Sequence, residues 1–198
     1  MVDNNSGLNE RIAAQVRELR AARGFSLDVL SAKSGISRSM ISLIERGESS
    51  PTAVVLEKLA AGLDVTLASL FDPAGSQAAA ASPVVRREAQ PEWKDPASGY
   101  VRRNVSPPGI PQPIQIVEVA FPGRARVAFE TGNRGALVYQ QIWIFEGTID
   151  ITWGDELFHL RPGDCMAMQL DRPVLFHNPS SKPARYAVVL SSSNSPKR

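Results

Sequence analysis

The chain changes composition abruptly near Asp72, and this change constrains its fold more than any other feature of the sequence. Residues 1–72 contain only one of the 15 prolines, Pro51. Proline-poor segments rich in Ala, Leu, Glu and Arg favour helices, whereas frequent proline among aromatic and β-branched residues favours short strands. We therefore predict two domains, α then β, with boundaries 1–72 and 84–198 and a linker of small residues at 73–83. A single α+β domain is the alternative.

The overall composition excludes several classes of protein. The 198 residues are 43% hydrophobic and 21% charged, as in soluble globular proteins, and no apolar run is long enough to cross a membrane. The first residues, Met1–Glu10, lack the basic-then-apolar order of a secretory signal. The single cysteine, Cys165, excludes an internal disulfide. We expect a cytoplasmic protein with no membrane partner.

The N-terminal 72 residues predict a bundle of five helices. Apolar residues recur at helical spacing over residues 8–19, and Gly24 ends this first segment. A fourth helix begins at Pro51-Thr52, and Thr66–Phe71 forms a last helical turn.

Two short helices lie between these segments. Ser26 and Ser37 can cap their N-termini, and Gly47 ends the second of them. Gly35 stands in the turn between them, where a residue that tolerates positive φ is needed. Such a pair is a helix-turn-helix unit, whose second helix enters the major groove of DNA.

The stretch LDVLSAKSGISRSMISLIERG at 27–47, followed by ESSPT at 48–52, resembles the XRE family of bacterial and phage repressors. The resemblance covers residues 8–71 in the family's order of five helices. It departs at Ser31, where the family usually has alanine.

The resemblance implies contacts between the third helix and double-stranded DNA. Base edges would meet Arg38, Ser39, Ser42 and Leu43, and phosphates would meet Ser37, Arg46, Ser50 and Thr52. Arg38 can hold the O6 and N7 atoms of guanine together, although it can also be a solvated surface arginine. In this family the residues corresponding to Arg20 and Glu45 form a salt bridge that fixes the recognition helix.

The charge of the N-terminal region does not favour tight DNA binding by one copy. Residues 1–72 carry eight Lys or Arg and nine Asp or Glu. A DNA-binding domain usually has a basic surface, so we expect weak non-specific affinity and a homodimer that reads a two-fold operator. Trp143 and Phe145 are candidates for a hydrophobic pairing face.

The C-terminal region predicts a small β-barrel, because eight short apolar or alternating runs recur between turns. The runs are Ile114–Ala120, Val127–Glu130, Leu137–Phe145, Ile149–Trp153, Leu157–Leu160, Cys165–Leu170, Val174–Phe176 and Tyr186–Leu190. The strings QQIWIFEGTIDI at 140–151, LRPGD at 160–164 and FHNP at 176–179 resemble the cupin family. The resemblance implies a jelly-roll barrel, and cupins joined to an XRE domain form a class of bacterial transcription regulators.

Many cupins are metalloenzymes, but this chain departs from the family's pattern of metal ligands. Its four ligand places are taken by Arg134, Ala136, Gln140 and Val174. The two histidines, His159 and His177, match none of these places, and we expect them to be surface or half-buried side chains. We therefore expect no metal, no cofactor and no catalytic residue.

Without a metal, the predicted barrel leaves a cavity for a small-molecule effector. Arg134 and Gln140 can hold a carboxylate there, although Arg134 can instead face solvent in its glycine-flanked turn. Met168, Val174 and Phe176 can form the apolar wall, with ordinary core packing as the alternative for them. We expect Cys165 to be a buried structural thiol.

These observations favour a sequence-specific DNA-binding transcriptional regulator whose cupin domain senses a small molecule. Two other functions stay open. One is a metal-dependent cupin enzyme tethered to a DNA-binding domain, and the other is an antitoxin-like repressor whose C-terminal part binds a protein.

Overall fold

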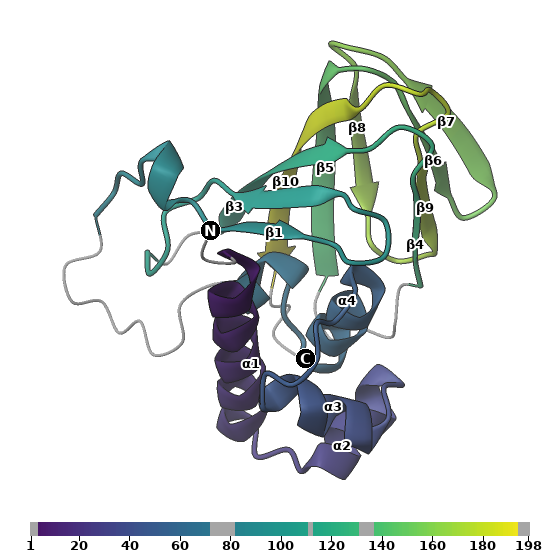
Figure 1. Ribbon diagram of the computed structural model, residues 1–198. Helices are drawn as coiled ribbons and strands as arrows, with labels where there is room; N and C mark the ends of the chain where they lie inside the picture. The colour runs from purple at the N-terminus through teal and green to yellow at the C-terminus, as the bar shows by residue number, and fades with distance from the viewer. Residues whose placement is uncertain (1–3, 72–81, 111–112, 131–136, 194–198) are drawn as a thin grey trace.

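The computed structural model describes residues 4–71, 82–110, 113–130 and 137–193. A helical region comes first and is followed by two antiparallel sheets (Figure 1). Among the described residues, no helix has both the length and the apolar character that a membrane span requires.

The helical region contains four α-helices and one 3-10 helix. They are α1 (Asn4–Ala22), α2 (Leu27–Ser34), α3 (Arg38–Glu45), α4 (Ala53–Gly62) and η1 (Leu67–Phe71). This region therefore has four α-helices where five helices were expected, because the last helical turn is a 3-10 helix. The five residues of η1 form the tighter 3-10 turn, and the Thr66 hydroxyl accepts a hydrogen bond from the Ser69 N–H at its start.

The short helices begin and end where local chemistry predicts. The side chains of Ser26, Ser37 and Thr52 each accept a hydrogen bond from a backbone N–H in the first turn of α2, α3 and α4. Gly35 ends α2 with a φ of 69°, a left-handed conformation that few other residues adopt at low cost. The helices then pack around a common apolar core. That core includes Leu8, Ile12, Val16, Leu30, Ile41, Ile44, Leu56, Leu59 and Leu63.

The C-terminal region consists of a six-stranded and a four-stranded sheet. The six-stranded sheet has the order β1 (Glu92–Lys94), β2 (Val101–Asn104), β3 (Ile114–Phe121), β10 (Ala184–Ser193), β5 (Leu137–Glu146) and β8 (Cys165–Gln169). The four-stranded sheet has the order β4 (Arg126–Phe129), β9 (Val174–His177), β6 (Ile149–Trp153) and β7 (Glu156–Leu160). A short 3-10 helix, η2 (Arg87–Ala89), precedes β1. The eight predicted runs correspond to β3–β10, whereas β1 and β2 are additional strands.

Strand β5 shows how the six-stranded sheet separates its two faces. Along this strand, buried and exposed side chains alternate from Leu137 to Phe145. The buried side chains are Val138, Gln140, Ile142 and Ile144, and the exposed apolar ones are Leu137, Tyr139, Trp143 and Phe145. The inner face therefore forms the core of the C-terminal region, and the outer face of β5 presents aromatic side chains.

The helical region packs directly against the sheets. Figure 1 shows α4 beside the sheets, whereas α2 and α3 lie at the far end of the helical region. A series of aromatic rings crosses the boundary, with centroids of successive rings 5.7 to 6.4 Å apart. The series runs through Phe71, Trp93, Tyr100, Phe121, Tyr186, Phe176 and Phe129. The division into 1–72 and 84–198 stays a prediction, because most of the linker lies outside the described residues.

Candidate DNA interface and interdomain cavity

Helix α3 is the recognition helix expected from the sequence. One of its faces packs in the helical core, and its other face is exposed to solvent. Ile41 and Ile44 are buried in the helical core. The side chain of Arg38 is 67% exposed at the start of the helix, with its Nε atom 3.6 Å from Asp28 Oδ1. The other residues expected at base edges range from exposed to half-buried: Ser39, Ser42 and Leu43. Arg38 is therefore free to reach a ligand outside the protein, since an exposed ion pair holds it only weakly.

Two of the residues expected at phosphates are helix caps. Ser37 caps α3 and Thr52 caps α4, so each hydroxyl accepts a backbone hydrogen bond. A backbone N–H at a helix N-terminus is also a good donor to a phosphate. Their positions are thus consistent with structural and DNA-binding roles at once.

The other two phosphate candidates have side-chain partners within the protein. The Ser50 hydroxyl accepts a hydrogen bond from the Asn9 amide at 2.9 Å. Arg46 forms a two-point ion pair with Glu48, with both N–O distances 2.8 Å, and this pair lowers the pKa of Glu48. A phosphate at Arg46 would therefore compete with the Glu48 carboxylate.

A two-point ion pair joins α1 to the recognition helix. Arg20 Nε and Nη2 donate to the two carboxylate oxygens of Glu45 at 2.7 and 2.8 Å, and Nη1 donates to the Phe25 carbonyl. The hydrogen bond with Glu45 raises the pKa of Arg20. Because Glu45 is buried, this pair fixes the position of α3 relative to α1.

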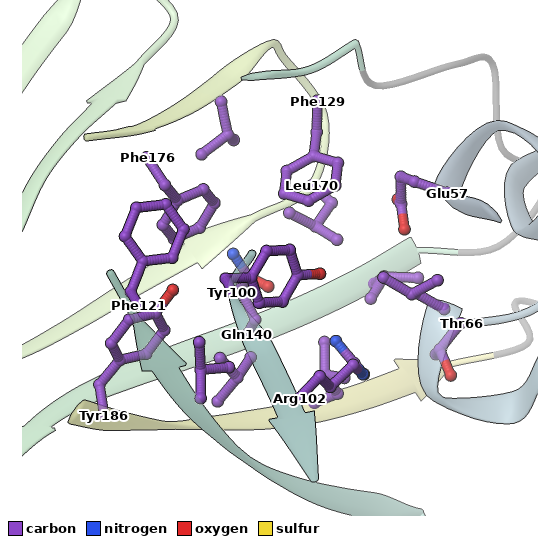
Figure 2. Close-up of a pocket in the computed structure, with 16 residues that line it drawn as sticks. Glu57, Thr66, Tyr100, Arg102, Phe121, Phe129, Gln140, Leu170, Phe176 and Tyr186 are labelled. Atoms are coloured by element: carbon purple, nitrogen blue, oxygen red, sulfur yellow. The ribbon is translucent and has the colours of Figure 1, made fainter. Parts of the chain in front are cut away.

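A cavity lies inside the C-terminal region at its boundary with the helices (Figure 2). Figure 2 shows Glu57 and Thr66 at the helical end and Phe121, Phe176 and Tyr186 at the other end. Glu57 comes from α4 and Thr66 precedes η1, so the helical region supplies part of the wall. A molecule in the cavity would therefore contact both regions of the chain.

Arg102 on β2 is the most unusual side chain in this wall. It is only 6% exposed, and within the described part of the chain its Nε and Nη2 atoms have no hydrogen-bond partner. Its guanidinium carbon lies 5.6 Å from the centroid of the Phe71 ring of η1. Burial lowers the pKa of Arg102, although an arginine stays charged at neutral pH.

The groups that interact with the Arg102 charge are two phenols. Tyr100 interacts with it electrostatically and through a side-chain hydrogen bond, and Tyr186 interacts with it electrostatically. Burial raises the pKa of Tyr100 to about 12 and raises that of Tyr186 well above the ordinary value. Both phenols are therefore neutral at physiological pH, so neither supplies a negative charge to the guanidinium.

Of the five residues expected from the sequence to bind the effector, three line the cavity, one lies next to it, and one lies outside the described residues. Gln140, Val174 and Phe176 line the cavity. Met168 lies next to it, where its sulfur accepts a hydrogen bond from the Gln140 amide at 3.1 Å. Arg134, like the Ala136 position, lies outside the described residues.

The thiol of Cys165 and the two imidazole side chains do not line this cavity. Cys165 is exposed at the start of β8, so the prediction of a buried thiol is wrong. Its place on the outer face of the sheet, opposite Trp143, accounts for its exposure. His159 and His177 flank Asp150 on neighbouring strands. No group of three or more His, Cys, Asp or Glu suited to a metal ion occurs among the described residues.

No pattern in the sequence predicts that Arg102 lines a cavity. Strand β2 reads Val-Arg-Arg-Asn, which has no apolar alternation, and a short charged run is usually exposed. Only its pairing with β1 and β3 turns Arg102 inward. The sequence does not predict Glu57, Thr66 or Tyr100 at the cavity either, because packing between distant segments brings them there.

The geometry defines a helix-turn-helix region that packs against a two-sheet region with an internal cavity. Residues 16–70 match the helix-turn-helix family HTH_3. Over 62 residues the chain is 40% identical to the HTH-type transcriptional regulator SutR of Escherichia coli strain K12, covering 31% of this chain and 35% of that protein. It is 37% identical over 62 residues to the HTH-type transcriptional regulator SinR of Bacillus subtilis strain 168, covering 31% and 56%. The chain thus spans about a third to a half of these curated relatives.

A solved structure is similar over the whole chain. The crystal structure of an HTH_3 family transcriptional regulator from Vibrio cholerae has a TM-score of 0.72 and 23% identity, and the match covers 97% of this chain and 99% of that one. At this identity the likeness shows the fold, and it includes both regions. The helix-turn-helix part of the resemblance found in the sequence is confirmed. The cupin-like interpretation of the second region stays a prediction.

Proposed function

We propose that the chain is a sequence-specific DNA-binding transcriptional regulator and that its C-terminal domain senses a small-molecule effector. The observation that carries the proposal is the shared wall of the cavity, to which Glu57, Thr66 and Leu67 contribute from the helical region. A ligand there changes the free energy of the contact between the two regions. It alters DNA binding if it has different affinities for the competent and incompetent forms.

The helical region supports the DNA-binding part of the proposal. The exposed side of α3 carries Arg38, and the buried ion pair between Arg20 and Glu45 holds the helix in place. In this proposal, Arg38, Ser39, Ser42 and Leu43 face base edges. Phosphates are met by Ser37, Arg46, Ser50 and Thr52.

The strand order supports the interpretation of residues 84–198 as a cupin jelly roll. Strands β3, β10, β5 and β8 form one four-stranded layer, and β4, β9, β6 and β7 form the other. Two such antiparallel sheets, with consecutive strands exchanged between them, are the arrangement of a jelly roll. Strands β1 and β2 extend the first sheet toward the helices. In this proposal Gln140, Val174, Phe176 and the neighbouring Met168 surround the effector, and the domain is not an enzyme.

The outer face of the six-stranded sheet supports a homodimer. Six large apolar side chains are 37 to 52% exposed on this face: Ile114, Ile116, Leu137, Tyr139, Trp143 and Phe145. Monomeric proteins rarely expose so many large apolar groups together. A second copy is the partner that fits, because two recognition helices are needed to read a two-fold operator. Their half-sites would lie roughly 10 base pairs apart, or a multiple of that distance.

Genome-wide mapping of the sites bound by the full chain tests the DNA-binding part of the proposal. We expect a short two-fold sequence motif, and neighbouring genes that share one metabolic theme. Binding without any sequence preference would contradict this part. Elemental analysis of protein purified without a chelator or metal-affinity tag tests the enzyme alternative, which stoichiometric iron, manganese, nickel or zinc would revive.

A further inference from the structure

The buried guanidinium of Arg102 lies in the cavity wall. A buried guanidinium is costly to keep without hydrogen bonds, and native proteins usually pair such a group. Here Nε and Nη2 are buried without a partner among the described residues, and both phenols that interact with the charge are neutral at physiological pH. The Phe71 ring and a hydrogen bond with Tyr100 offset part of this cost, and a bound anion would pair with the nitrogens that they leave free.

We propose that the cavity binds a small organic acid, with Arg102 holding a single carboxylate and the aromatic wall holding an apolar or aromatic body. The guanidinium offers two nitrogens to two carboxylate oxygens, which is the strongest neutral-pH pairing available to an arginine. This inference rests on the proposed function and names the chemical class of its effector.

The remaining wall defines the body of the ligand. Figure 2 shows Phe121, Phe176 and Tyr186 at the end away from the helices. Leu170 and Val174 also line the cavity. The Phe176 and Tyr186 rings are stacked, with centroids 6.4 Å apart and an interplanar angle of 4°. Such a surface favours an apolar or planar group over a second charge.

The position of Arg102 also gives the ligand a direct connection to the DNA-binding region. The guanidinium lies over the ring of Phe71, which belongs to η1 of the helical region. Two residues along β2, the Asn104 amide donates a hydrogen bond to the Ala68 carbonyl, also in η1. A carboxylate that draws the guanidinium into the cavity therefore weakens its attraction to the Phe71 ring and changes the contact between β2 and η1.

Calorimetric titration of the full chain with hexanoate and benzoate tests the proposal. Each acid is compared with its amide, hexanamide or benzamide, which has the same body and no charge. We expect at least one acid to bind roughly tenfold or more tightly than its amide, as expected for a charge-assisted hydrogen bond. Arg102→Met should lose this preference. Arg161→Met, at an exposed arginine outside the cavity wall, should retain it.

The stability of the unliganded variant separates a ligand-binding role from a structural one. If the role of Arg102 is to bind a ligand, Arg102→Met removes a buried charge that costs stability in the unliganded chain. The melting temperature of this variant should then be equal to or higher than that of the wild type. A lower melting temperature without ligand would overturn the proposal, as would equal binding of acids and amides or no binding of either. Operator binding is measured separately with and without the acid. Arg102-dependent binding of an acid that leaves operator affinity unchanged would support the anion site and contradict effector sensing.

Discussion

The Asp95 carboxylate, just after β1, accepts a hydrogen bond from the backbone N–H of Ala53, the first residue of α4, at 2.9 Å. Its other oxygen accepts hydrogen bonds from the N–H and hydroxyl of Ser98. A negative charge at a helix N-terminus is favourable because unpaired N–H groups point toward it. Asp95 thus connects the start of α4 to the turn that leads into Tyr100 and Arg102.

Removing this connection should destabilise the whole chain. We expect Asp95→Ala to lower the free energy of unfolding by about 2 kcal/mol, because a buried charge-assisted hydrogen bond is lost. Urea unfolding followed by tryptophan fluorescence measures the effect. Glu88→Ala, at an exposed carboxylate of η2, is the control and should leave the midpoint unchanged. Equal urea midpoints for Asp95→Ala and Glu88→Ala would show that the Asp95 contact contributes nothing to the free energy of unfolding.

Arg38 is the residue on which we expect base reading to depend. Arg38→Ala should weaken binding to the cognate operator by about 1 to 3 kcal/mol and relax the sequence preference at one position. Arg38→Lys retains the charge but loses the two-point donor geometry, so non-specific binding should persist while the preference falls. Fluorescence anisotropy with operator and scrambled DNA measures both quantities. Wild-type operator affinity in Arg38→Ala would mean that α3 is not placed on DNA as proposed.

Thr52 is expected to act on affinity without acting on specificity. Thr52→Ala removes the cap of α4, so stability should fall by about 1 kcal/mol, and all DNA sequences should bind more weakly in the same proportion. Thr52→Ser keeps the hydroxyl and should preserve both properties. The same anisotropy and urea measurements apply. A change in sequence preference in Thr52→Ala would contradict a phosphate contact.

The ion pair between Arg20 and Glu45 should behave as a unit. Arg20→Met leaves the buried Glu45 carboxylate without its partner, which should cost about 3 kcal/mol of stability. The double variant Arg20→Met, Glu45→Met removes both charges and should recover much of this loss. Urea unfolding of these two variants and of Glu45→Met alone completes the double-mutant cycle. If the stability loss of the double variant equals the sum of the losses of the two single variants, the two side chains do not stabilise each other.

The outer face of the six-stranded sheet is expected to form the dimer. Trp143→Glu places a charge in the centre of the exposed aromatic surface, so the mass from light scattering should fall to the 21.5 kDa of one chain. Leu157→Glu makes the same change at an exposed leucine of the four-stranded sheet and should not alter the mass. A wild-type chain that is already monomeric at micromolar concentration, with full operator affinity, would contradict the dimer.

The sequence alone determined the features that depend on neighbouring residues. Ser26, Ser37 and Thr52 cap helices because each hydroxyl needs only the backbone three residues ahead. Strands β3–β10 follow from the alternation of apolar residues between turns, which reflects a half-buried surface. The pairing of Arg20 with Glu45 is not local, and it was accessible only through the resemblance to a known family.

The tertiary structure alone decided which polar residues are buried and which segments meet. Leu67–Phe71 has the apolar pattern of a helical turn, and the structure shows it as a 3-10 helix packed against α1 and α4. Cys165 has the surroundings of a core strand, yet the register of β8 turns it outward. Arg102 has the surroundings of a surface arginine, yet pairing of β2 between β1 and β3 turns it into the cavity. Periodicity shows that a strand has two faces, but only the packing of distant segments decides which face is covered.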